Sequence, residues 1–176
     1  MVSKSRLFAG FGAVLFLVTS SALTIVVILS SNQNSSSSTA STSLKTTVNC
    51  PNGFNVATGS KLQGFTPIKQ PLTHLAINDI NKGKGAVVKS GATVSACYVG
   101  ALASSGTVFG DSGSQSQTFS LNGVILGWQL GIPGMKVGGT RELLIPSSMG
   151  YGKTAQTNIP ANSDLVFIVT IESVQG

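Results

Sequence analysis

The feature that most constrains this chain is an uncharged apolar run near its start. The run extends from Leu7 to Leu29, and as a helix rising about 1.5 Å per residue it would span the apolar core of a bilayer. Lys4 and Arg6 precede the run, so the positive-inside rule predicts a cytoplasmic N-terminus and an exported remainder. We therefore expect residues 1–29 to form an uncleaved signal anchor, and the globular fold to be built from residues further along the chain.

A cleaved signal peptide is the alternative interpretation of this run. Small residues from Ser20 to Ala22 offer a place where a signal peptidase could cut. The apolar run continues directly past this point, which a cleaved signal would not require, and this favours the anchor. We expect a single-pass membrane protein whose C-terminal domain lies outside the cytoplasm.

A polar run separates the apolar run from the rest of the chain. Residues 30–43 consist of Ser, Thr, Asn, Gln and one Ala, and such a composition cannot bury a core. We expect residues 30–47 to be a flexible linker, residues 48–70 an N-terminal extension and residues 71–176 the folded part. The length of that last segment suits one domain.

The charged residues, the histidine and the cysteines limit the kinds of site to expect. The formal net charge is +6, but the lysines are scattered, so we expect no nucleic-acid partner. The single histidine, His74, and the two cysteines match no standard metal-ligand spacing, so neither a metal nor another cofactor is expected. Cys50 and Cys97 both fall in the exported part, where they either form a disulfide or remain two unpaired small residues.

The pattern after residue 71 is one of short strands. Between residues 92 and 102 the side chains of Val94, Ala96 and Tyr98 alternate with those of Ser95, Cys97 and Val99, which is typical of a strand with two contrasting faces. The segment over 164–174 is the most apolar and is expected in the centre of the sheet. The expected strands lie within residues 72–80, 92–102, 106–121 (strand, polar loop, strand), 138–148 and 164–174.

The pattern becomes helical between the third and fourth of these stretches. Apolar residues there recur at spacings that fit one short helix, which Pro133 and Gly134 should end early. The residues that would share it are Ile125, Trp128, Leu130, Ile132 and Met135. The sequence therefore predicts an α+β fold, a twisted antiparallel sheet wrapped around one short helix, preceded by an N-terminal transmembrane helix.

The order of several short motifs matches a known family. They are a Val-Ile pair before Gly-Trp, a basic strand ending in Ile-Pro, then Tyr-Gly, a second Ile-Pro and Leu-Val-Phe. In this chain they are Val124, Ile125, Gly127, Trp128, Gly138, Arg141, Ile145, Pro146, Tyr151, Gly152, Ile159, Pro160, Leu165, Val166 and Phe167. Over roughly residues 72–174 the chain resembles the FKBP-type peptidyl-prolyl isomerases, the macrolide-binding immunophilins. The resemblance implies their fold and isomerase activity.

The resemblance also implies a site. The indole of Trp128 would form the floor of an apolar pocket for a prolyl ring, and the hydroxyl of Tyr151 and the backbone N–H of Ile159 would hold substrate carbonyls. The catalytic residues implied are Tyr98, Phe109, Asp111, Trp128, Tyr151 and Phe167, with Val124, Ile125 and Ile159 binding substrate. The implied partners are proline-containing polypeptides and macrolide ligands. Taken singly, each apolar member is more typical of a core.

The chemistry implied is physical and not covalent. Rotation about an X-Pro amide needs no nucleophile or general base, and the sequence shows no Ser/His/Asp or Cys/His constellation. A pocket that binds the twisted amide better than the planar one would suffice. The preferred hypothesis is thus a membrane-tethered isomerase acting on exported proteins.

One alternative arises from a departure from the family pattern. Family members usually have Phe directly followed by Asp, whereas Gly110 separates Phe109 from Asp111. A shift of one residue turns a side chain to the opposite face of a strand, unless a bulge at Gly110 restores its direction. This departure motivates a weakly active or inactive chaperone or binding module as the first alternative. The second alternative is a surface interaction or adhesion protein that uses the domain only as a scaffold, and an apolar pocket too narrow for proline would support it.

The segment before the resemblance has its own expectation. Residues 44–70 are expected to add an edge strand to the sheet, tied by Cys50 to Cys97, whose side chain should point away from the pocket. An irregular spacer without contacts is the alternative.

Overall fold

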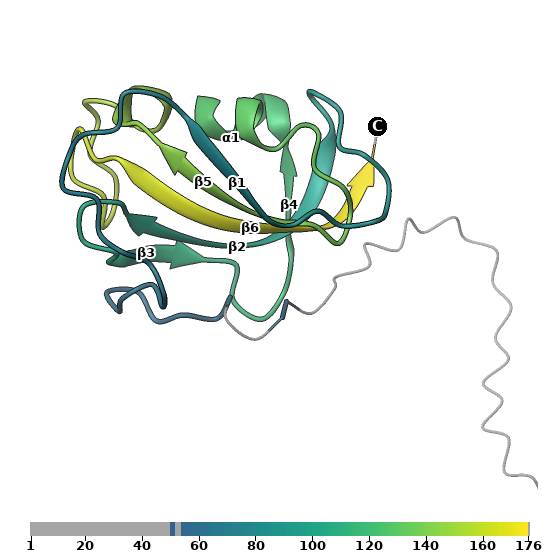
Figure 1. Cartoon of the computed structure of the whole chain (residues 1–176), viewed down its shortest axis with the longest axis horizontal. Helices are drawn as coiled ribbons and strands as arrows, with labels where there is room; N and C mark the ends of the chain where they lie inside the picture. The colour runs from purple at the N-terminus through teal and green to yellow at the C-terminus, as the bar shows by residue number, and fades with distance from the viewer. Residues whose placement is uncertain (1–49, 52–53, 176) are drawn as a thin grey trace, which may run out of the picture. The chain divides into compact units, whose positions relative to one another are not determined.

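The computed structural model describes residues 50–51 and 54–175, which form an antiparallel sheet with one short α-helix on one face (Figure 1). The strands are β1 (Ala76–Asn81), β2 (Thr93–Leu102), β3 (Val108–Asp111), β4 (Gln117–Ser120), β5 (Thr140–Ile145) and β6 (Leu165–Gln175). The helices are α1 (Leu126–Gly131) and two single 3-10 turns, η1 (Leu121–Gly123) and η2 (Ser147–Met149). The α+β arrangement predicted from the sequence is confirmed.

The predicted membrane anchor lies outside the described residues. So does the predicted linker, because the description of the chain begins at Cys50. Within residues 50–51 and 54–175, no helix is both long enough and apolar enough to span a membrane.

The centre of the sheet is β6, as its apolar sequence predicts. The strand order is β1-β5-β6-β2-β3, and β4 pairs with β2 beyond the end of β3. β6 pairs with β2 from Leu165 to Gln175 and with β5 from Leu165 to Thr170. The part of β6 that is paired on both edges, from Leu165 to Val169, is entirely apolar, and polar residues begin at Thr170, where the pairing with β5 ends.

The two faces of the sheet bury different clusters, and β2 contributes to both. Val94 and Ala96 of β2 belong to the cluster beneath α1, which we call the inner face. Cys97, Val99 and Ala101 belong to a second cluster on the reverse, the outer face. The alternation predicted for this strand is confirmed.

The helix α1 is shorter than its apolar pattern suggests. Trp128, Ile132 and Met135 are buried as expected, but Ile125 precedes the helix and Leu130 is 55% exposed. Leu126 and Leu130 stand one turn apart on the side of α1 that faces solvent. Of the five residues expected to share the helix, Trp128 and Leu130 lie within α1, and Ile132 and Met135 follow its last residue, Gly131.

Two glycines allow α1 to lie close against the sheet. A Cβ atom on Gly127 would stand 2.5 Å from the Ile145 side chain, and one on Gly131 would stand 2.7 Å from that of Leu143. Both glycines face β5, four residues apart on one side of the helix. No larger residue fits at either place unless the helix moves away from the sheet.

A buried arginine holds the C-terminal end of α1. Arg141 of β5 donates from Nη1 to the carbonyl oxygen of Gly131 at 2.6 Å and from Nε to Asp79 of β1 at 2.6 Å. The hydrogen bond from Arg141 lowers the pKa of the Asp79 carboxyl below its ordinary value, and burial opposes this shift. A cation at a helix C-terminus complements the helix dipole, so Arg141 joins β1, β5 and α1.

The N-terminal extension covers the outer face without forming a strand. Phe54 is buried there, and Val56, Leu62 and Phe65 pack beside it. The extension makes one isolated bridge, between Lys61 and Thr107. The extension is neither the expected edge strand nor a spacer without contacts, because side chains and backbone both attach it. The Gly59 N–H donates to the carbonyl oxygen of Val108 at 2.8 Å, and the Val108 N–H donates to that of Ser60 at 2.9 Å.

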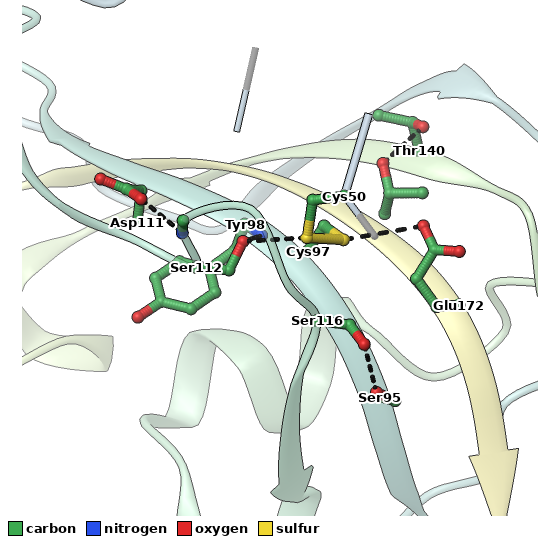
Figure 2. The surroundings of a disulfide bond; sticks show 11 residues. Cys50, Ser95, Cys97, Tyr98, Asp111, Ser112, Ser116, Thr140 and Glu172 are labelled. Carbon is green, nitrogen blue, oxygen red and sulfur yellow. Dashed lines mark hydrogen bonds between the residues drawn. A yellow bond between two sulfur atoms is a disulfide. The ribbon is translucent and has the colours of Figure 1, made fainter. Parts of the chain in front are cut away.

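We call the described part of the N-terminal extension, residues 50–51 and 54–70, the cover, and a disulfide ties it to β2. Cys50 and Cys97 are bonded, with their Cα atoms 5.6 Å apart (Figure 2). The Ser112 hydroxyl lies 3.4 Å from the Cys50 sulfur and accepts a hydrogen bond from the backbone N–H of Tyr98. The Glu172 carboxyl lies 3.7 Å from the Cys97 sulfur, and burial raises its pKa. The disulfide thus ties the cover to Cys97, and the next residue, Tyr98, packs on the inner face.

We predict that Gly127→Ala lowers the free energy of unfolding by about 1–3 kcal/mol, the usual cost of overpacking. The added methyl group would overlap the Ile145 side chain. Urea unfolding measures the loss, and Gly123→Ala is the control because nothing lies within 4 Å of its Cβ position. Equal stability of the two variants would contradict the close approach.

We also predict that replacing both cysteines with alanine lowers the free energy of unfolding by about 4 kcal/mol, the chain-entropy value for a loop of this length. The sequence separation between the two cysteines is 47 residues. Limited proteolysis should then cut near Phe54, which the unbonded cover exposes. If the double variant resists urea and protease as well as the parent does, the disulfide is not what holds the cover on the sheet.

Candidate functional site

A pocket opens between the inner face of the sheet and the start of α1. Its volume is about 300 Å³. The residues that line it are Tyr98, Phe119, Gly123, Val124, Ile125, Trp128, Tyr151 and Phe167. Aromatic and aliphatic side chains make most of this surface, and the only ionisable groups among the lining residues are the phenols of the two tyrosines. The pocket is thus suited to an apolar group without charge.

Each wall of the pocket comes from a different element. Tyr98 lies on β2, Phe119 on β4 and Phe167 on β6. These three strands are neighbours because β2 pairs with both β4 and β6. Trp128 comes from α1, whose glycines let it approach the sheet. Tyr151 comes from the turn after η2 and is 37% exposed at the mouth.

Trp128 forms the floor through contacts with three rings. Its ring centroid lies 5.6 Å from that of Tyr98, 5.2 Å from that of Phe119 and 5.4 Å from that of Phe167. The interplanar angles are 82°, 74° and 81°, the edge-to-face geometry that aromatic pairs prefer. Its buried Nε1 finds no hydrogen-bond acceptor among the described residues, so ring contacts alone hold the indole.

Phe109 supports the pocket from behind and is not part of its lining. Its ring packs edge-on against Phe167, with 5.5 Å between centroids. Gly100 makes this possible, because a Cβ there would stand 2.6 Å from the Phe109 ring and 2.7 Å from the Phe167 ring. Phe109 thus acts on the site through Phe167.

Asp111 does not join the pocket lining either. The pairing of β2 with β3 shifts between Gly100 and Ala101, which leaves Phe109 without a partner, as in a β-bulge. Asp111 then stands opposite Val99, whose side chain belongs to the outer face. Its carboxylate accepts a hydrogen bond from the Gly113 N–H in its own turn (Figure 2). The bulge falls one residue before Gly110, and Asp111 stays outside the lining of the pocket.

Ile159 lies beside the site but its backbone is already engaged. The side chain is buried in the inner cluster, and its N–H donates to the carbonyl oxygen of Gln156 at 3.0 Å. The expectation that this N–H holds a substrate carbonyl is not met in the structure. The N–H of Ile125, a lining residue, has no acceptor among the described residues.

The phenol of Tyr98 is held in its neutral form. Burial raises its pKa above the ordinary value, and the nearby charges of Asp111 and then Tyr151 add to the shift. A neutral phenol can donate a hydrogen bond into the pocket. No group of three or more His, Cys, Asp or Glu residues in the described part of the chain could hold a metal ion.

Two lining residues escape sequence reasoning. Phe119 is a lone aromatic in the short strand β4, and Gly123 stands just before the Val124–Ile125 pair. The signal that could have found Phe119 is the alternation of β4, since Thr118 and Ser120 on either side of it are polar. Gly123 carries no chemical signal of its own.

Comparisons with known proteins place these residues in a wider group. A family model described as "FKBP-type peptidyl-prolyl cis-trans isomerase" matches residues 85–172. A probable FK506-binding protein of Corynebacterium glutamicum is 42% identical over 109 residues, which cover 61% of this chain and 92% of that protein. FK506-binding protein 3 of Candida albicans is 40% identical over 121 residues, which cover 66% of this chain but only 28% of that longer protein.

Solved structures agree with the sequence relatives. A peptidyl-prolyl cis-trans isomerase from Pseudomonas syringae pv. tomato matches with a TM-score of 0.54 at 31% identity, covering 58% of this chain and 76% of that one. FkpA from Escherichia coli matches with a TM-score of 0.54 at 35% identity, covering 64% of this chain and 52% of that one.

We predict that Phe119→Leu weakens binding of a Leu-Pro peptide several-fold, whereas Asp111→Asn changes it less than about twofold, because only the first residue lines the pocket. Trp128 is the only tryptophan in the chain and forms the pocket floor, so its fluorescence reports occupancy. A large loss of affinity in Asp111→Asn, with Phe119→Leu unaffected, would reverse the assignment of these two residues.

Proposed function

The chain belongs to the family of FKBP-type peptidyl-prolyl cis-trans isomerases, and on that premise we propose that the pocket above Trp128 receives the ring of a substrate proline. The observation that carries the proposal is the joining of Tyr98, Phe119 and Phe167 around the indole in a cavity of about 300 Å³. Such a cavity holds an apolar ring and excludes water from the amide beside it.

The pocket lowers the barrier by binding one form of the amide better than another. Resonance keeps an X-Pro bond planar, and rotation costs about 18–20 kcal/mol. The twisted amide has lost this resonance and part of its dipole, so an apolar surrounding disfavours it less than the planar form. The acceleration comes from this difference in binding and requires no covalent step.

Donors at the mouth of the pocket position the peptide. We assign the backbone N–H of Ile125 and the hydroxyl of Tyr151 to substrate carbonyls, because both residues line the pocket and this N–H has no acceptor among the described residues. The neutral phenol of Tyr98 is a third donor that faces the ring. These contacts fix the chain on both sides of the proline while its amide rotates.

The substrates proposed are exported polypeptides, with the enzyme tethered to the membrane. The uncharged run from Leu7 to Leu29 supports the tether. The Cys50–Cys97 disulfide supports an oxidising location, since such bonds persist outside the cytoplasm. The names of the relatives, FK506-binding proteins, motivate FK506 as the ligand that should compete for the pocket.

One observation favours a second candidate, a binding module with slow turnover. The carboxylate of Asp111, which the family resemblance implies as catalytic, is not among the groups that line the pocket. In that case the pocket would bind proline segments tightly while accelerating their isomerisation only slightly. A turnover measurement separates the two candidates.

We predict that the chain accelerates cis-to-trans isomerisation of Leu-Pro tetrapeptides, and that FK506 abolishes the acceleration by occupying the pocket. A protease-free isomerisation assay measures the rate. Trp128→Leu should lower kcat/KM by roughly tenfold or more while the fold persists, since the floor is lost. Phe54→Leu is the matched control, because it truncates an aromatic on the outer face.

The outcomes discriminate clearly. Peptide binding without acceleration would establish the binding module. Equal losses of stability and activity in Trp128→Leu would make the indole an ordinary core residue and would remove the pocket assignment.

A further inference from the structure

The carboxylate of Asp164, just before β6, joins two segments that are distant in sequence. Its Oδ1 accepts a hydrogen bond from the backbone N–H of Ser147 at 2.7 Å, and its Oδ2 accepts one from that of Leu72 at 2.7 Å. Its own carbonyl oxygen accepts the N–H of Ala103 at 2.9 Å. Hydrogen bonds to a carboxylate are roughly twice as strong as those between neutral groups, so this is a firm attachment.

The attachment continues from Ser147 to the pocket wall. The carbonyl oxygen of Ser147 accepts the N–H of Gly150 at 3.1 Å and that of Gly152 at 2.9 Å. These two glycines stand on either side of Tyr151. The carbonyl oxygen of Gly152 in turn accepts the N–H of Asn162 at 2.7 Å, which closes the loop back to the residues before Asp164. One series of hydrogen bonds therefore runs from the carboxylate to the two glycines that flank Tyr151.

Backbone hydrogen bonds matter more for the position of the Tyr151 side chain than for the positions of the other aromatic side chains of the pocket. Tyr98, Phe119, Trp128 and Phe167 hold one another through ring contacts. Tyr151 takes part in no ring pair among the described residues and is 37% exposed. Its direction is set by the turn that carries it, and Gly152 holds that turn with a φ of 57°.

We propose that Asp164 is a positioning residue for the isomerase reaction, acting through Ser147 to hold Tyr151 over the pocket. The inference rests on the proposed function, in which the Tyr151 hydroxyl binds a substrate carbonyl. Asp164 touches neither substrate nor the reacting amide. Its effect on catalysis must therefore pass through Tyr151, and this makes the inference testable by a double-mutant cycle.

The experiment compares Asp164→Asn in two backgrounds of the full chain. In the parent, loss of the carboxylate should lower kcat/KM by roughly tenfold, since a misplaced positioning group costs at least that much. In a Tyr151→Ala background the same substitution should leave kcat/KM unchanged, because the side chain that it positions is gone. Amide hydrogen exchange at Ser147, Gly150 and Gly152 should accelerate in both backgrounds.

Controls separate positioning from general stability. Asp164→Glu keeps the carboxylate and should recover most of the lost activity. Phe54→Leu destabilises the chain from the outer face and should leave kcat/KM unchanged at temperatures where the variant is folded. If Asp164→Asn fails to fold, Ser147→Pro in the two backgrounds provides the same cycle, because it removes the N–H that donates to the Asp164 carboxylate.

Several results would overturn the inference. It fails if Asp164→Asn lowers kcat/KM by the same factor with and without the Tyr151 side chain, or if a folded Asp164→Asn is as active as the parent. Inactivity of the parent chain would instead refute the proposed function, so the two failures are distinguishable.

Discussion

The close approach of α1 to β5 is the constraint on which the rest of the structure depends. Gly127 and Gly131 present no side chain toward the sheet, so the helix lies directly on Ile145 and Leu143. Only at this depth can Trp128 reach the rings of β2, β4 and β6 together. Arg141 holds the C-terminal end of the helix by donating a hydrogen bond to the carbonyl oxygen of Gly131. The helix is therefore fixed at both ends, and the pocket floor with it.

The inner face and the outer face of the sheet carry different features. The inner face carries the pocket, and the outer face carries the disulfide and the side chains of the extension. Ser112 stands at the boundary, because its hydroxyl lies beside the Cys50 sulfur and accepts the N–H of Tyr98, while its own N–H donates to the Tyr98 carbonyl oxygen. The strand that presents Tyr98 to the pocket is thus stiffened from the side opposite the pocket.

Much of this arrangement could be predicted from the sequence because it arises from local patterns. The alternation of Val94, Ala96 and Tyr98, the apolar run that became β6 and the Pro-Gly pair after α1 each report on their own neighbourhood. The position of Asp111 depends instead on the register between β2 and β3, which a single shift changes. The pairing of the Ile159 N–H with Gln156 and the role of Phe119 likewise depend on contacts that no periodicity encodes. Site residues that rest on register or loop pairing therefore required the structure.

The uncharged lining has a consequence for the surroundings in which the protein can work. The only ionisable groups among the lining residues are phenols, whose ordinary pKa is about 10, and the shift at Tyr98 is upward. No proton has to be gained or lost for the pocket to be in its working state at mildly acidic or neutral pH. An enzyme that depended on a histidine would lose activity as its medium turned acidic. The lining of this pocket contains no histidine and no carboxylate, so it has no such dependence.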